Sequence, residues 1–310
     1  MTRILPVLAL LLALILAAPA TAQDEPALMS GDELGMPEIE VTITDEGWEA
    51  PSEIAAGRYL VTASYDGEQD FGTAAFLMLP DDWTIDDLNS RLEPEASATP
   101  DQPSDGTSVS STIASMDWLP EVTMAGGVSP IAGGVAQGII DLEPGNWAIW
   151  SDGYSPAAIP LTVTGLMPIE LPDPDNAVTI TGTSDGETFA FDVAREFTAG
   201  TQIVEVRNES HQPHFLEVVQ LSSLVTEEQL QAYFQREDGA TPDAALDVPA
   251  DFEVWLTSIY AATQSPGTTQ WLVVTIDPGA YAMVCWLPDP EHNNESHAQR
   301  GMITVFEVVS

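Results

Sequence analysis

The sequence predicts an all-β protein of two Greek-key β-sandwich domains in tandem, each with one short inserted helix. Three observations support this prediction. The chain of 310 residues contains 22 Gly and 24 Pro, so turns are frequent. Short segments rich in Val, Ile and Thr alternate apolar and polar residues, which is typical of strands with one buried face. The same series of features also occurs twice, in the same order.

Each repeat begins with an aromatic residue, an Ala-Gly turn and an alternating strand. Trp48 and Gly57 open the first series, and Phe191 and Gly200 open the second. A second apolar strand follows, and then a helix start. Thr84 and Thr226 each precede an apolar residue by four positions and have Asp or Gln three positions later, which is the pattern of a capping box.

Each repeat ends with a Pro-Gly turn, at Gly145 and at Gly279, that leads into another alternating strand. We therefore predict one domain over 38–165 and a second over 177–310. The segment 166–176 between them contains three prolines, so we interpret it as an extended, semi-stiff linker.

The first 22 residues have the pattern of a signal peptide. Arg3 precedes an uncharged apolar run over 4–18, and Ala-Thr-Ala at 20–22 fits a cleavage site. The alternative, an uncleaved anchor, is disfavoured because spanning a bilayer takes about 20 apolar residues. We expect an exported protein, periplasmic or extracellular, with no membrane span after signal removal.

The charge balance restricts the partners. The chain has 49 Asp and Glu but only 7 Arg and Lys, a formal net charge of −42. Nucleic-acid binding requires clustered cations, so this class is excluded. A protein partner would need a basic surface.

The side chains that bind soft metals are concentrated in the second half, which holds all four His and the only Cys. They form two clusters, His211 with His214, and Cys285, His292 and His297 with Met302. A thiolate, imidazoles and a thioether are the ligands of a soft metal site. A single Cys excludes an internal disulfide and a multi-Cys zinc site.

The order of these parts resembles the cupredoxins, the blue-copper proteins. A strand is followed by a Pro-His pair and the next strand, and a Pro-Gly turn leads into a strand that ends at Cys285. The motif His297-x4-Met302 precedes the last strand. The resemblance implies one copper ion in the C-terminal domain, with His214, Cys285 and His297 as ligands and Met302 as a weak axial ligand. It also implies that Asn208 ties the ligand loops together.

The spacing departs from the family pattern, because eleven residues (286–296) separate Cys285 from His297, where familiar members have two to four. His292 is therefore an alternative to His297, and His211 an alternative to His214. Nothing in the sequence ties His297 to Cys285, so we expect this long loop to be mobile without metal.

The first half contains no His and no Cys, and we expect it to lack a metal site. Its alignment with the second half puts Phe71 at the place of His214 and Ser151 at the place of Cys285.

The sequence thus predicts an exported copper-binding protein that carries electrons. The alternative is a metal-free β-sandwich that binds a partner or serves the cell envelope, with Cys285 and Met302 as core residues. We predict that the protein is not an enzyme, since copper oxidases and nitrite reductases need further copper centres that four His cannot supply.

Overall fold

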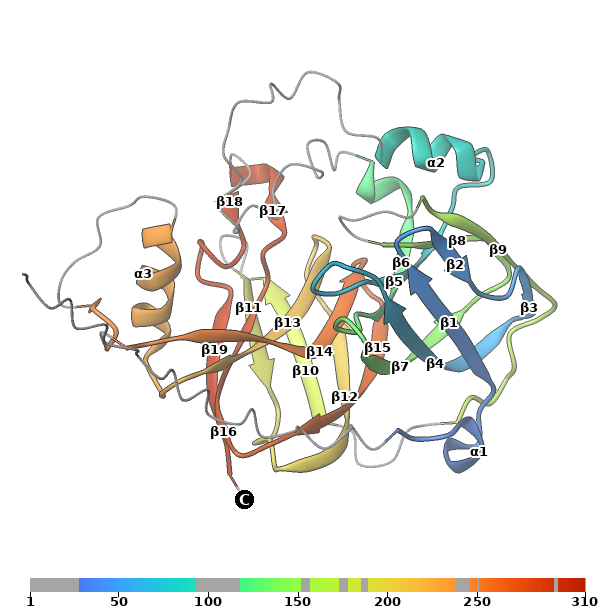
Figure 1. The fold of residues 1–310 in the computed structure, drawn as a ribbon. Coiled ribbons are helices and arrows are strands. Elements are labelled where there is room, and N and C mark those ends of the chain that lie inside the picture. Colours follow the sequence, from blue (N-terminus) through green and yellow to red (C-terminus); the bar gives the residue numbers. More distant parts are fainter. Residues whose placement is uncertain are drawn as a thin grey trace, which may run out of the picture.

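The computed structural model describes residues 28–92, 118–151, 157–172, 178–184, 189–237, 246–249, 251–292 and 295–309. These residues form two large β-sheets, and short helices lie outside them (Figure 1). The predicted signal peptide lies outside the described residues. In the part of the chain that is described, no helix is long and apolar enough to cross a membrane.

The first sheet has eight strands and contains segments from both halves of the chain. In spatial order they are β11 (Phe189–Val193), β10 (Val178–Ser184), β12 (Gly200–Asn208), β15 (Thr269–Ile276), β7 (Val135–Leu142), β4 (Gly57–Asp66), β1 (Glu38–Thr44) and β2 (Gly47–Glu49).

The second sheet has nine strands and also draws on both halves. In spatial order they are β19 (Ile303–Val308), β16 (Gly279–Val284), β13 (His214–Leu221), β14 (Val254–Gln264), β6 (Thr123–Val128), β5 (Ala74–Met78), β8 (Gly145–Trp150), β9 (Ile159–Thr164) and β3 (Glu53–Ala55). A separate ribbon consists of β17 (Pro288–Asp289) and β18 (Glu295–Ser296).

The two halves have the same topology. To compare them, we number the strands of each half from 1 to 8 in chain order and leave out β3 and the ribbon of β17 and β18. In this numbering the spatial order is 2-1-3-6 in the first sheet and 5-4-7-8 in the second sheet, for both halves. Strands 1 and 3 pair in parallel in each half, β1 with β4 and β10 with β12. This agreement confirms the predicted pair of all-β Greek-key sandwiches.

The halves join edge to edge, and both sheets continue across the junction. β15 pairs antiparallel with β7 in the first sheet, and β14 pairs antiparallel with β6 in the second. Figure 1 shows the yellow-to-red second half beside the blue-to-green first half. Strand edges that would otherwise expose unpaired amides are thereby covered. The boundaries at 38–165, 166–176 and 177–310 stay a prediction.

One arginine links the halves at this junction. Arg58 in β4 forms a two-pronged ion pair with Asp141, at 2.7 and 2.9 Å, and donates to the carbonyl of Pro172 at 2.8 Å. Its guanidinium carbon lies 4.2 Å from the ring centroid of Trp271 in β15. The side chain thus connects the first half, the segment before the second half, and the second half.

A helix is inserted at the predicted place in each half: α2 (Ile85–Leu92) and α3 (Glu227–Glu237). The hydroxyl of Thr84 accepts the amide of Asp87, and the Asp87 carboxylate accepts the amide of Thr84 in return. Thr226 and Gln229 make the same reciprocal pair before α3. These capping boxes explain where both helices begin. Further helical segments among the described residues include α1 (Gly31–Leu34), η1 (Leu119–Glu121) and η3 (Pro290–His292).

Candidate metal centre

The three candidate ligands come from two neighbouring strands and the loop that follows one of them. His214 is the first residue of β13, and Cys285 directly follows β16. These strands pair with Glu217 opposite Val284, which places the two ligands at the same end of the sheet. His297 follows β18, and its amide donates to the carbonyl of Leu287 at 2.9 Å, which brings it back towards Cys285.

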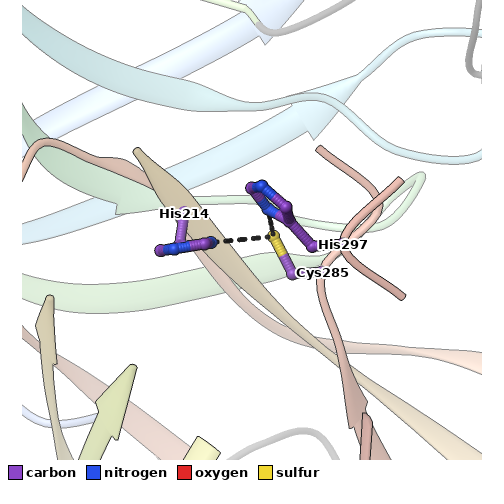
Figure 2. A group of neighbouring side chains, drawn as sticks. All are labelled: His214, Cys285 and His297. Carbon is purple, nitrogen blue, oxygen red and sulfur yellow. Dashed lines mark hydrogen bonds between the residues drawn. The ribbon is translucent and has the colours of Figure 1, made fainter. Parts of the chain in front are cut away.

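The side chains of these three residues converge. The Cys285 Sγ lies 3.7 Å from the His214 Nδ1 and 3.5 Å from the His297 Nδ1 (Figure 2). The two imidazole centroids are 4.4 Å apart. Among the described residues, these three form the group of His, Cys or carboxylate side chains with ligand atoms all within 4.8 Å of one another.

The spacing fits a shared metal ion. Metal–sulfur and metal–nitrogen bonds of about 2.3 and 2.0 Å, separated by about 115°, hold the two ligand atoms about 3.6 Å apart. The observed sulfur–nitrogen distances of 3.5 and 3.7 Å match this value. Two imidazoles and one thiolate are the donor set of a trigonal copper site.

Both imidazoles are in the uncharged form that binds metal. Burial lowers the pKa of His214 to about 2, and repulsion from His297 and His211 acts in the same direction. Burial also lowers the pKa of His297 to about 4, although Asp289 acts against this shift. At neutral pH each ring therefore keeps a lone pair on one nitrogen.

Burial raises the pKa of the Cys285 thiol to about 12. The backbone amides of Leu287 and Phe215 hydrogen-bond the sulfur and favour the thiolate, but they do not outweigh burial. A metal ion reverses this balance because coordination deprotonates a thiol. Metal uptake should therefore release a proton from Cys285.

Hydrogen bonds fix the ring orientation of His297. Its Nε2–H donates to the Gln212 Oε1 at 3.1 Å, which leaves Nδ1 as the atom facing the sulfur. The Gln212 Nε2 in turn donates to the Asp289 Oδ1 at 3.1 Å. Neither residue was predictable as part of the site, because a Gln and an Asp in separate segments of the sequence carry no motif.

A phenylalanine covers the two imidazoles. The ring centroid of Phe189, at the start of β11, lies 4.5 Å from that of His214 and 4.7 Å from that of His297. His214 is 5% exposed, and Cys285 and His297 are fully buried. The site is therefore closed to bulk solvent. Phe189 was not predictable as part of the site, because a single Phe at a strand start carries no motif.

The other sequence candidates are not members of this group of three. Met302 is fully buried in the same apolar cluster as Cys285, and its role as axial ligand stays a prediction. The His211 ring faces the Glu291 carboxylate at 3.5 Å in solvent, and the His292 Nδ1 faces the Asp289 carboxylate at 2.6 Å. Neither belongs to the group of three described above.

Asn208 has the contacts expected of a residue that ties the ligand loops. Its amide nitrogen donates to the carbonyls of Gln212 and Gln264, at 2.8 and 3.0 Å. Its amide oxygen accepts the hydroxyl of Ser210 at 2.7 Å. The loop that leads to His214 is thus held against β14.

The strand register locates the equivalent place in the first half. Trp147 pairs with Met78 as Tyr281 pairs with Gln220, so Ser151 corresponds to Cys285, as the sequence alignment predicted. By the same register, the residue of the first half that is equivalent to His214 is Gly72 rather than Phe71. The sequence alignment was off by one because the connection between the strands is one residue longer in the first half.

Ser151 accepts a backbone hydrogen bond like the one that Cys285 accepts from Phe215, although the first half lacks the ligand side chains. The amide of Thr73, the counterpart of Phe215, donates to the Ser151 hydroxyl at 3.4 Å. The Thr73 and Ser129 hydroxyls lie 3.1 Å apart, and all three side chains are buried. Small hydroxyl groups thus occupy the region that holds the imidazoles and the thiol in the second half.

Comparison with known proteins found no matching family model and no matching curated protein. Among solved structures, a reduced auracyanin from Roseiflexus castenholzii is 24% identical over 44% of this chain and all of its own, with a TM-score of 0.27. A multicopper oxidase is 10% identical over 88% of both chains, with a TM-score of 0.25. The copper nitrite reductase of Nitrosomonas europaea is 10% identical over 88% of this chain and 93% of its own, with a TM-score of 0.24.

One prediction from the sequence is wrong. The four histidines led us to exclude an enzyme, but the solved structures that match nearly nine-tenths of this chain include a multicopper oxidase and a nitrite reductase, which are enzymes. Counting histidines in one chain does not exclude catalysis, because a subunit can share a centre with another copy. The fold itself is that of two similar Greek-key sandwiches, with a buried His-Cys-His group in the second.

Proposed function

We propose that this protein is exported and exchanges single electrons through one copper ion held by His214, Cys285 and His297, with Met302 as a weak axial ligand. The observation that carries the proposal is the convergence of one sulfur and two Nδ1 atoms at 3.5 and 3.7 Å. The donor set and the spacing fit copper, which would supply a one-electron couple when bound.

The chain's own residues suit this role in three ways. The ligands belong to strands and a hydrogen-bonded loop of a rigid sandwich, which limits their movement between the two oxidation states. Phe189 and the surrounding apolar cluster exclude water. The thioether of Met302 is fully buried in the apolar cluster that also contains Cys285, and thioethers are soft ligands.

The proposed partner is a redox protein with a basic surface, since this chain has a formal net charge of −42. The proposed compartment is the periplasm or the cell exterior, which the predicted signal peptide at 1–22 supports. An electron exchange steered by charge should slow markedly as ionic strength rises.

A copper(II) titration followed by visible absorption tests the proposal. The wild type should bind one equivalent and develop an intense thiolate-to-copper band, and Cys285→Ser should lose the band. His211→Ala and His292→Ala are matched controls that remove a nearby imidazole outside the group of three, and both should keep it. A wild type that takes up no copper would refute the proposal and favour the metal-free module.

A further inference from the structure

The long loop between Cys285 and His297 places a buried carboxylate behind the candidate metal site. Asp289 in β17 is fully buried. Its carboxylate accepts hydrogen bonds from the Gln212 Nε2 at 3.1 Å, the amide of Glu291 at 2.9 Å and the His292 Nδ1 at 2.6 Å. The Arg300 Nε lies 3.3 Å from the Oδ2 of this carboxylate as an ion pair.

This arrangement connects Asp289 to a ligand through one side chain. The Gln212 amide donates to Asp289 and accepts from the His297 Nε2–H, so the order is carboxylate, amide, imidazole. Burial alone would raise the pKa of Asp289, but the hydrogen bonds from Gln212, His292 and Glu291 outweigh it and lower the pKa. The carboxylate therefore stays negative at neutral pH.

We propose that Asp289 and Gln212 are positioning residues that act through His297 to favour the more highly charged state of the bound metal. This inference rests on the proposed copper site. An ionised carboxylate polarises the Gln212 amide, strengthens the hydrogen bond from the His297 Nε2–H and makes the Nδ1 a better donor to a dication. The insertion that departs from the family spacing is, on this proposal, the element that supplies this support.

The proposal predicts opposite effects from the two ends of one ion pair. Asp289→Asn removes the negative charge while keeping the shape, and should raise the copper(II) dissociation constant about 10- to 100-fold, with a smaller effect on copper(I). Each tenfold difference between the two forms raises the reduction potential by about 59 mV. Arg300→Gln removes the neutralising cation, so it should lower the potential. Gln212→Met keeps the volume but breaks both hydrogen bonds, and should raise it.

The experiment measures the copper(II) and copper(I) dissociation constants and the reduction potential of the full-length protein and each variant. Glu291→Gln is the matched control, because it removes one negative charge from η3, directly after β17, at a side chain that is 57% exposed, and it should leave the potential unchanged. Urea unfolding of each metal-free variant identifies loss of fold.

The outcomes separate this inference from the proposed function. Copper binding by the wild type, with potentials of Asp289→Asn and Gln212→Met equal to that of Glu291→Gln, would overturn the positioning role and leave the copper site intact. Reduction potentials that shift in the same direction for Asp289→Asn and Arg300→Gln would also overturn it. Removing opposite charges must shift the potential in opposite directions, whereas a merely structural perturbation does not depend on the sign of the charge removed. If Asp289→Asn does not fold, the potential of Gln212→Met alone decides. A wild type without copper would refute both proposals.

Discussion

Acid should destabilise the metal-free protein through its two buried imidazoles. The pKa of His214 is lowered to about 2 and that of His297 to about 4, against about 6.5 in the unfolded chain. Below pH 6.5 the unfolded chain therefore binds protons that the folded chain does not, and stability falls as the pH falls. The loss is about 1.4 kcal/mol per pH unit for each ring, so between pH 7.5 and 5 it reaches about 4 kcal/mol in total.

Urea unfolding of chelator-treated protein at pH 7.5, 6.5, 5.5 and 5 measures this loss. Repulsion among the 49 acidic residues weakens as acid protonates them, and this would stabilise the fold at low pH and oppose the expected loss. About 1 M NaCl in every sample suppresses this repulsion, because it keeps the Debye length near 3 Å. His214→Gln and His297→Gln should each remove about half of the pH dependence. Two results would refute the reasoning. One is a wild-type free energy of unfolding that does not change between pH 7.5 and 5. The other is that both variants still lose the full amount of about 4 kcal/mol over this range.

Two further predictions concern the junction and the loop. Arg58→Met should lower the free energy of unfolding by about 3 kcal/mol, because it leaves Asp141 without its ion-pair partner and removes the contact with Trp271. The control is Arg91→Met, at an arginine that covers Trp83 within one half. It should lower the free energy of unfolding by less than about 1 kcal/mol in the same urea assay. Hydrogen exchange of the His297, Ala298 and Met302 amides should be slow both with copper and after chelation. Protection that appears only with copper would contradict the structure.

Much of the fold follows from local sequence patterns. The two Pro-Gly turns, the two capping boxes and the alternating strands each depend on residues a few positions apart, so they are visible in the sequence. The repeat then predicts two similar sandwiches, and the structure confirms them. The ligand candidates His214, Cys285 and His297 were identifiable because His and Cys are rare in this chain.

The continuous sheets were not predictable in the same way. Across the junction, β15 pairs with β7, with Trp271 opposite Ile139, and β14 pairs with β6. A strand edge that joins another domain has the same alternation as one that faces solvent, so no sequence pattern distinguishes them. The contact of Arg58 with Trp271 depends on this junction and was missed for the same reason.

The described residues of the long loop make contacts that the sequence did not reveal, and residues 293–294 lie outside the described part. We expected 286–296 to be mobile because its acids repel one another and no residue near it in the sequence ties it down. The structure buries one of these acids, Asp289, where it accepts hydrogen bonds from Gln212 and His292 and forms an ion pair with Arg300. The amide of Ala298 also donates to the carbonyl of Cys285 at 2.7 Å, next to the ribbon of β17 and β18.

These contacts join protein atoms only, so they do not depend on metal. Closing an eleven-residue loop costs little more conformational entropy than closing a short one, since the cost grows with the logarithm of length. The hydrogen bonds around Asp289 offset that cost before any ion binds. A short loop positions its His by limited reach, whereas this one positions His297 by its own buried hydrogen bonds. Loop length by itself is therefore no argument against a rigid metal site.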